Sequence, residues 1–332
     1  MRRALPTSAA ICGAIVLAAA LGAILSACGQ NQSAANASSN SAAATAQPAA
    51  APPQAPPPSQ LDGFDAAYAY DQTAKLVAFG PRPAGSDANA RQQQYIIAQL
   101  KSYGCPVEED DFHSQTPIGD VAMKDIVVKI PGARPDIVLF ATHYDTKTLA
   151  NFVGADDGAS STALMLELAR LLCARKNQLT LWIAFFDGEE AFNWEWQDPD
   201  NTYGSRNLAA QMALDGDLPH LKAMLLADMI GISNLRIERD ESSTPWLTDL
   251  VWNTAARLGY GNVFVSSSLP MDDDHTPFLH RGIAACDVID FDGAQQIWHT
   301  TNDTMDKIDP RSLGITGHVF LESFFALEQK FH

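Results

Sequence analysis

From Leu61 onwards, runs of consecutive apolar residues alternate with segments in which apolar residues recur every three or four positions. The first pattern is typical of buried strands and the second of helices that bury one face. We expect strands at 125–130, 136–141, 179–186, 221–227, 263–265 and 283–289, and helices at 87–103, 161–174, 203–213, 246–258 and 314–329. This alternation predicts an α/β sandwich built on a mostly parallel sheet.

The first 60 residues do not follow this pattern. Residues 1–28 begin with a short basic stretch, continue with an apolar run, and end in small residues before Cys28. This segment resembles the signal peptide and lipobox of bacterial lipoproteins, in which the signal is cut before a cysteine that is then lipidated. An ordinary secretory signal or a membrane helix is the alternative, but the run is short for a membrane span.

Residues 29–60 are nearly all Ala, Ser, Gln, Asn and Pro, so they cannot bury a core and predict a disordered linker. Residues 61–332 have the length of one large α/β domain. We therefore expect an exported protein that is lipid-anchored through Cys28 to the cell envelope, on its periplasmic or extracellular face. We expect the protein to be a monomer.

The net charge of −17 makes nucleic acid and anionic membranes poor partners, so membrane contact is expected only through the lipid. Beyond Cys28 the cysteines are Cys105, Cys173 and Cys286. This odd number argues against a disulfide framework but leaves one bridge possible in an oxidising compartment. Cys173 lies in an apolar helical stretch and is interpreted as a small buried hydrophobic residue.

Two adjacent carboxylates, Glu189 and Glu190, follow the apolar run 179–186. In open α/β sheets, functional sites collect at the carboxyl ends of strands. Two neighbouring side chains at such an end can take different roles, one binding a metal and the other transferring protons.

Other candidate metal ligands also lie just beyond predicted strands. They are His143, Asp145, Asp156, Asp157, Asp228 and His299. A single carboxylate at such a place often caps a helix, but a mixture of histidine and carboxylate at several strand ends is what zinc requires. The sequence therefore predicts a metal site.

Several of these residues stand in longer motifs. The motifs are THYDTK at 142–147, MLELAR at 165–170, FFDGEEAF at 185–192, YGSRNL at 203–208, DDHTPFL at 273–279 and IWHT at 297–300. Together they resemble the zinc-aminopeptidase-like superfamily (the M28 clan) and, within it, the animal-type glutaminyl-peptide cyclotransferases, or glutaminyl cyclases. The resemblance covers essentially all of 62–332. It implies a zinc-exopeptidase-like fold, a three-layer α/β sandwich whose central mixed, mostly parallel sheet has helices on both faces.

The resemblance also implies a role for each site residue. Asp157, Glu190 and His299 would bind one catalytic zinc, with His143 beside them as a ligand of a second metal or as a neighbour of the ligands. Glu189 would be the general acid/base.

Asp228 and Asp273 would share the substrate amine and its protons. Trp298 and Trp196 would form walls of the substrate pocket, although Trp194 is near Trp196 in the chain. Core packing is the alternative interpretation of each tryptophan.

The implied substrate is a peptide or protein with an N-terminal glutamine, which would be converted to pyroglutamate with release of ammonia. The attack is intramolecular, so positioning provides much of the acceleration. Zinc would polarise the γ-carbonyl, and Glu189 would move the proton from the amine to the leaving group.

The chain departs from the animal cyclases at three places. Thr142 and Thr162 stand where those proteins have a disulfide, and Asp287 stands where their pocket has a histidine on a late strand. The aromatic residue expected shortly before Trp298 is not evident among residues 293–296.

The main alternative is a two-zinc aminopeptidase. It would use the same five ligands, namely His143, Asp157, Glu190, Asp228 and His299. We favour the cyclase because of the stretches 273–278 and 203–206 and because of Trp298.

A non-catalytic binding domain on this fold is less favoured, because the chain keeps every expected metal ligand and the general base. A serine hydrolase is disfavoured because the chain has no Gly-x-Ser-x-Gly elbow. We expect His275 to orient neighbouring acids and His280 to lie on the surface.

Overall fold

The computed structural model describes residues 54–332. The predicted signal peptide, with Cys28, and most of the predicted linker lie outside these residues. Within 54–332, no helix is both long enough and apolar enough to cross a membrane. The described part of the linker ends in a short 3₁₀ helix, η1 (Pro58–Gln60), and Ala55 already packs against the core.

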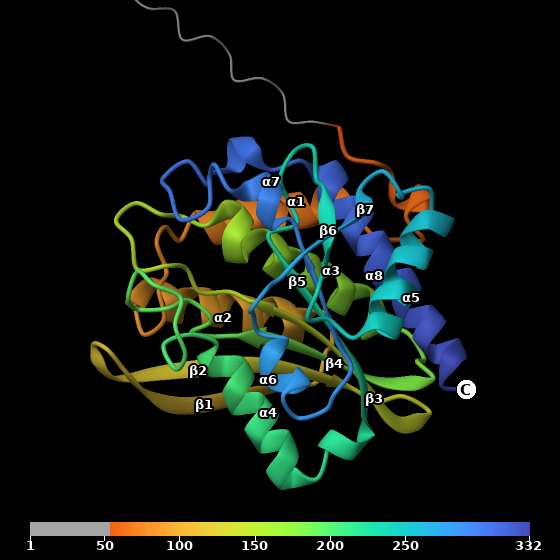
Figure 1. The fold of residues 1–332 in the computed structure, drawn as a ribbon, viewed down its shortest axis with the longest axis horizontal. Helices are drawn as coiled ribbons and strands as arrows, with labels where there is room; N and C mark the ends of the chain where they lie inside the picture. Colours follow the sequence, from red (N-terminus) through yellow and green to blue (C-terminus); the bar gives the residue numbers. More distant parts are fainter. Residues whose placement is uncertain (1–53) are drawn as a thin grey trace, which may run out of the picture. The chain divides into compact units, whose positions relative to one another are not determined.

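A six-stranded mixed sheet runs through the centre of the described domain (Figure 1). In spatial order it contains β1 (Val107–Thr116), β2 (Gly119–Ile130), β4 (Leu179–Phe186), β3 (Arg134–His143), β5 (Leu221–Asp228) and β8 (Ala285–Ile289). The pairs β1–β2 and β2–β4 are antiparallel, whereas β4–β3, β3–β5 and β5–β8 are parallel. A second sheet pairs β6 (Ile237–Asp240) with β7 (Phe264–Leu269).

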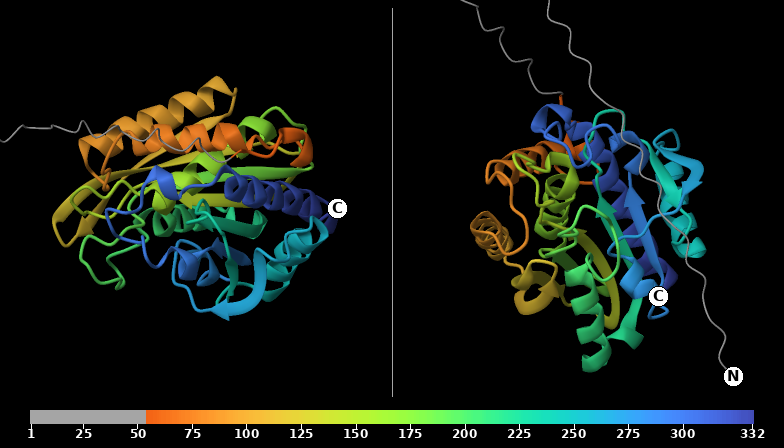
Figure 2. Two further views of the ribbon diagram at one scale, coloured as in Figure 1. Left: turned by 90° about the horizontal axis from the view of Figure 1, so that it is seen from above. Right: turned by 60° about the vertical axis from the view of Figure 1, so that its left-hand side comes forward.

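Helices cover both faces of the large sheet (Figure 2). One face carries α1 (Ala66–Val77), α2 (Asp87–Ser102), α3 (Ser161–Leu172) and α8 (Pro310–Lys330), and the other carries α4 (Tyr203–Asp215) and α6 (Thr276–Leu279). Helix α5 (Pro245–Arg257) packs beside α8 and β8, and α7 (Phe291–Ala294) is a single turn after β8. The expected three-layer α/β sandwich with a central mixed sheet is confirmed.

Alternate residues of the central strands explain why two layers of helices are needed. In β3, Val138 and Phe140 belong to the core under α3 and α8, while Leu139 and Ala141 belong to the core under α4. Successive side chains of a strand point to opposite faces, so a strand without polar positions must be covered on both sides.

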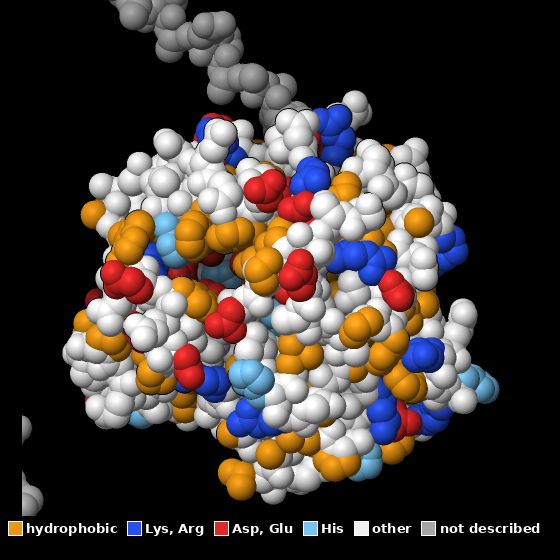
Figure 3. Space-filling model, in the orientation of Figure 1, with side chains coloured by type: hydrophobic (Ala, Val, Ile, Leu, Met, Phe, Trp, Pro, Cys, Tyr) orange, Lys and Arg blue, Asp and Glu red, His pale blue; other side chains and the backbone are white. Residues whose placement is uncertain are grey.

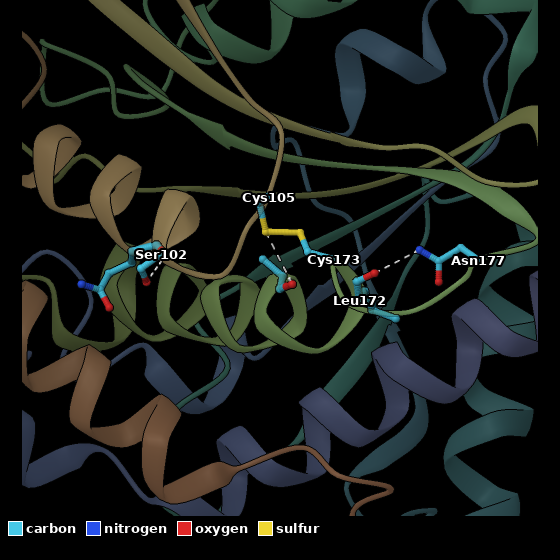
Figure 4. Close-up of a disulfide and its surroundings, with 7 residues drawn as sticks. Ser102, Cys105, Leu172, Cys173 and Asn177 are labelled. Atoms are coloured by element: carbon cyan, nitrogen blue, oxygen red, sulfur yellow. Dashed lines mark hydrogen bonds between the residues drawn. A yellow bond between two sulfur atoms is a disulfide. The ribbon is translucent and has the colours of Figure 1, made fainter.

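A disulfide joins Cys105, in the turn after α2, to Cys173, at the end of α3 (Figure 4). The interpretation of Cys173 as a small buried hydrophobic residue is therefore wrong, whereas the single bridge that the sequence left possible is present. The bridge depends on the fold, which brings together two cysteines that are 68 residues apart in the sequence. Cys286 is free and buried.

Hydroxyl groups link β3 to α3 at Thr142 and Thr162, where the resemblance to the animal cyclases implied a disulfide. Thr142 Oγ1 donates to Ser161 Oγ at 2.7 Å, and Thr162 Oγ1 donates to the backbone oxygen of His143 at 2.9 Å. Hydrogen bonds thus hold the end of β3 against the start of α3.

Candidate metal centre and active site

The parallel strands end at one edge of the sheet, and the predicted site residues lie there. His143 is the last residue of β3, Asp228 is the last residue of β5, and Glu189 and Glu190 follow β4. His299 lies in the segment after β8, and Asp157 lies in the turn η2 (Ala155–Ser160) that precedes α3.

Two groups of side chains have the spacing needed to hold a metal ion. In the first, His299 Nε2 lies 3.2 Å from Glu190 Oε1 and 3.6 Å from Asp157 Oδ2. In the second, His143 Nε2 lies 3.0 Å from Asp228 Oδ1 and 3.3 Å from Asp157 Oδ1. Asp157 belongs to both groups, one carboxylate oxygen facing each.

The donor atoms of the first group fit a metal such as zinc. Both carboxylate oxygens of Glu190 and Oδ2 of Asp157 are buried without any hydrogen-bond partner. Burial raises the pKa of Asp157 to about 6 and that of Glu190 to about 7 in the metal-free protein. A cation would relieve this cost, and carboxylate oxygen with imidazole nitrogen is a normal zinc donor set.

Two further aspartates hold the turn that carries Asp157. Asp303 accepts hydrogen bonds from the backbone N–H groups of Asp156 and Asp157, at 2.7 and 3.1 Å. Asp156 in turn accepts one from Gly231 N–H at 2.7 Å. The role of Asp303 was not predicted from the sequence. The only feature that could have indicated it is its position four residues after His299.

Asp145 holds the Glu189–Glu190 pair. Its carboxylate accepts hydrogen bonds from the backbone N–H of Glu189 at 3.1 Å and of Glu190 at 3.4 Å. Asp145 therefore positions the neighbouring loop and belongs to neither group of metal donors.

Lys147 is a second residue without an assigned role in the sequence analysis. Its side chain is buried, and Nζ lies 3.7 Å from Glu190 Oε2 without any hydrogen-bond partner.

Glu189 is oriented toward His143, with Oε2 3.7 Å from Nδ1 of the imidazole. Burial raises the pKa of Glu189 well above its ordinary value, although the nearby His143 opposes this shift. Burial by itself would lower the pKa of His143, but the carboxylates of Glu189 and Asp228 raise it well above its usual range. A carboxyl group whose pKa is raised toward neutrality can both accept and donate a proton.

Asp228 and Asp273 are two further acidic residues that line the site. Asp228 Oδ1 accepts a hydrogen bond from Met229 N–H at 2.8 Å, and Met229 has a left-handed backbone with φ 43°. Burial, with a smaller contribution from the Asp228 carboxylate, raises the pKa of Asp273 to about 7.

These residues open into a cavity of about 240 Å³. Its walls are formed by Asp157, Glu189, Glu190, Trp196, Asp228, Met229, Pro270, Met271, Asp272, Asp273, Ile289, Phe291, Trp298 and His299. Figure 3 shows a hollow on one face of the molecule with a histidine visible inside it and hydrophobic and acidic side chains around its rim.

Aromatic rings form one side of this cavity. Trp298 stacks on the His299 ring with 4.1 Å between centroids, and Phe291 meets Trp298 edge-on at 5.0 Å. Phe291, in α7, is an aromatic residue a few positions before Trp298 that packs against it, and it lies outside residues 293–296. Trp196 also lines the cavity, and its Nε1 donates to Asp272 Oδ2 at 3.1 Å.

The remaining residues considered in the sequence lie outside the cavity. Asp287 is buried in β8, and neither of its carboxylate oxygens has a hydrogen-bond partner. His275 Nε2 lies 3.1 Å from Asp240 Oδ2, and His280 is exposed. Trp194 is 65% exposed.

Similarity to known proteins agrees with this arrangement. Residues 125–324 match peptidase family M28. The glutaminyl-peptide cyclotransferase of Drosophila melanogaster is 30% identical over 258 residues, covering 69% of this chain and 72% of that protein.

Two solved structures share the fold along almost their whole length. An Acidobacteriales bacterium glutaminyl cyclase superimposes with a TM-score of 0.76 and 37% identity, over 86% of this chain and 99% of the other. A Zn-dependent exopeptidase from Parabacteroides distasonis does so with a TM-score of 0.71 and 26% identity, over 79% of this chain and 98% of the other.

Proposed function

The chain belongs to peptidase family M28 and, within it, to the glutaminyl-peptide cyclotransferases, and from this premise we propose that it cyclises the N-terminal glutamine of peptides. The product is a pyroglutamyl peptide, and ammonia is released. The observation that carries the proposal is the cavity in which Asp157, Glu190 and His299 lie beside Glu189, Asp273 and Trp298.

Asp157, Glu190 and His299 would hold a zinc ion, which supplies a Lewis acid for the γ-carbonyl of the bound glutamine. Their unpartnered, buried oxygens support this assignment. Asp303 and Asp145, which accept hydrogen bonds from backbone N–H groups of the ligand-bearing loops, keep the ligands in place.

The chain's own residues orient the substrate and move one proton. Asp228 and Asp273 accept hydrogen bonds from the α-amine and hold it near the γ-carbonyl carbon. The amine nitrogen bonds to that carbon, and the bond from the carbon to the amide nitrogen breaks. Glu189 takes the proton that the amine gives up and delivers it to the amide nitrogen, which leaves as ammonia.

The walls of the cavity exclude competing water. Trp298 and Trp196 bring apolar surface to the cavity that also contains the carboxylates. A drier site strengthens each polar interaction and reduces hydrolysis of the side-chain amide.

One observation favours a second candidate, a two-zinc aminopeptidase. His143, Asp157 and Asp228 form a second group of possible ligands that shares Asp157 with the first. The solved exopeptidase with the same fold supports this alternative. In that enzyme Glu189 would activate a water molecule against a peptide bond.

The deciding experiment incubates the zinc-loaded protein with a Gln-initiated peptide and a Leu-initiated peptide. Mass spectrometry is expected to show loss of one ammonia from the first peptide and no change in the second. Release of a free amino acid from either peptide would establish the aminopeptidase instead. Zinc per chain, measured on the same sample, distinguishes one bound ion from two.

We further propose that the protein is exported and anchored by a lipid on Cys28. The Cys105–Cys173 disulfide supports export, because such bridges persist in oxidising compartments. Mass spectrometry of the membrane fraction is expected to find a diacylated Cys28 peptide, and Cys28→Ala is expected to release the protein into the soluble fraction. A soluble wild-type protein with residues 1–28 intact would contradict the proposal.

A further inference from the structure

Asp240 is a buried carboxylate that lies behind the wall of the active-site cavity, and the proposed reaction does not use it. It is the last residue of β6, it is 4% exposed, and it is not among the residues that form the cavity walls. Residues 270–273, by contrast, form a continuous part of those walls. This stretch ends in Asp273, to which the proposed reaction assigns the substrate amine.

The Asp240 carboxylate holds the segment that carries Asp273 on both sides of that residue. Oδ1 accepts a hydrogen bond at 2.9 Å from the backbone N–H of Met271, two residues before Asp273. Oδ2 lies 3.1 Å from Nε2 of His275, two residues after Asp273. Asp273 is therefore fixed between two attachment points on one carboxylate.

The serines that follow β6 complete the set of donors around Asp240. Ser242 donates its backbone N–H to Oδ1 at 3.0 Å and its hydroxyl to Oδ2 at 2.7 Å, and the Ser243 hydroxyl donates to Oδ2 at 2.7 Å. Burial by itself would raise the pKa of Asp240, but the hydrogen bonds from His275, Ser242 and Ser243 lower it well below its ordinary value. Asp240 is thus an ionised acceptor, and Nε2 of His275 is the donor in the bond between them.

We propose that Asp240 is a positioning residue for the reaction, and that it sets the place of Asp273 through its hydrogen bonds to Met271 and His275. This inference rests on the proposed function, in which Asp273 binds the substrate amine. The reactive geometry depends on where the Asp273 carboxylate stands relative to Glu189, which a different loop carries. A displacement of about 1 Å from the productive geometry can slow an enzymatic reaction about 100-fold.

The test is a double-mutant cycle of Asp240→Asn and Asp273→Asn on a Gln-initiated peptide. Asp240→Asn keeps the size of the side chain but replaces one acceptor oxygen by an amide group that only donates. We expect this variant to lower kcat/KM about tenfold to 100-fold with zinc per chain unchanged. The double variant should stay within about twofold of Asp273→Asn alone, because the position of residue 273 no longer matters once its carboxylate is gone. Losses that multiply would overturn the inference.

Glu328→Gln is the matched control for a general loosening of the fold. Glu328 is a buried carboxylate of α8 that accepts a hydrogen bond at 2.5 Å from the backbone N–H of Gln178. Gln178 precedes β4 and Glu189 follows it, so this contact lies at the other end of the strand from the site. Glu328→Gln should lower the unfolding temperature and leave kcat/KM unchanged below it. A kinetic loss as large as that of Asp240→Asn would contradict a specific role for Asp240.

Ser242→Ala provides a milder variant that decides the question if Asp240→Asn does not fold. Ser242 is exposed, and its hydroxyl is one of the donors to Asp240. We expect Ser242→Ala to lower kcat/KM about twofold to fivefold in the wild type and to have no effect in Asp273→Asn protein. The same loss in both backgrounds, or no loss in either, would overturn the inference.

Peptide binding to Glu189→Gln protein, measured by calorimetry, gives the same cycle without turnover. If no peptide is cyclised but Asp240→Asn weakens binding only when Asp273 is present, the proposed reaction fails while the inference stands. If peptides are cyclised but the effect of Asp240→Asn is absent or independent of Asp273, only the inference fails.

Discussion

The Lys147 ammonium lies 3.7 Å from Glu190 Oε2 although both side chains are buried. Glu190 is also a candidate metal ligand, so two cations would share one carboxylate when zinc is bound. In the metal-free protein Lys147 and, to a smaller extent, His143 offset the charge of this carboxylate. The pair therefore links stability to metal content.

We expect Lys147→Met to destabilise the metal-free protein by about 3 kcal/mol, because breaking a buried ion pair leaves a charge uncompensated. The loss should be smaller with zinc bound, since zinc also offsets Glu190. Thermal unfolding with EDTA and with excess zinc checks this difference. Lys222→Met removes a partly exposed pair with Asp136 and serves as the control, with a cost below about 1 kcal/mol in both conditions. The same loss with and without zinc would contradict the proposed link.

The two adjacent glutamates are expected to respond differently to the same substitution. Glu189→Gln should lower kcat by about 10²- to 10⁴-fold with zinc content unchanged, because it removes the group that moves the proton. Glu190→Gln should lower zinc per chain, because it removes a candidate ligand. Metal analysis and steady-state kinetics on both proteins separate the two roles. Loss of zinc from Glu189→Gln would refute this division.

Removal of the Cys105–Cys173 disulfide is expected to destabilise the protein. The bridge closes a loop of 68 residues, for which the chain-entropy model gives about 4 kcal/mol. Urea unfolding of the double variant Cys105→Ser, Cys173→Ser is expected to show a loss of this order. A reducing agent should destabilise the wild type and leave the double variant unchanged; sensitivity of the double variant would point to another cause.

Asp125 predicts a pH dependence of stability. Burial raises the pKa of Asp125 well above its ordinary value, against the lowering effect of the hydrogen bond it accepts from Asp187 N–H. Above about pH 4 the unfolded chain has lost this proton while the folded protein keeps it. Folding therefore becomes less favourable as the pH rises from about 4 toward the folded pKa.

Asp125→Asn removes this titration and keeps a carbonyl oxygen for the Asp187 N–H. We expect its stability relative to wild type to improve as the pH rises from about 5 toward the pKa of Asp125 in the folded protein, and to level off above that pKa. Urea unfolding across that range provides the measurement. Parallel stability curves for the two proteins would show that Asp125 stays ionised in the folded state.

Uninterrupted apolar runs made the central strands predictable. The strand at 179–186 has the predicted bounds, because all its residues except Thr180 are apolar and buried. Strand β1 was not predicted, since its residues Val107–Thr116 are acidic and polar and form an exposed edge. Helix α1 was also missed, because Gln72 and Thr73 are polar residues that the fold buries.

The candidate site was predictable where histidine and carboxylate side chains directly follow a predicted strand. The sequence pointed to Asp157, Glu190 and His299, and their ligand atoms lie within 4.8 Å of one another. It did not reveal Asp303 or Phe291, because their contribution depends on where two loops return to the sheet. Nor could it show that Cys173 meets Cys105, since their pairing follows from the packing of α3 beside the turn after α2.

The order in which the candidate ligands occur along the chain has a consequence for how the protein matures. His299 comes after β8, so it joins Asp157 and Glu190 only when this last strand has paired with β5. Contacts between such distant parts of a chain form late in folding. A domain in which β8 has not yet paired lacks the His299 ligand, so metal should bind only when folding is complete. A chain that crosses a membrane unfolded would therefore acquire its ion on the far side.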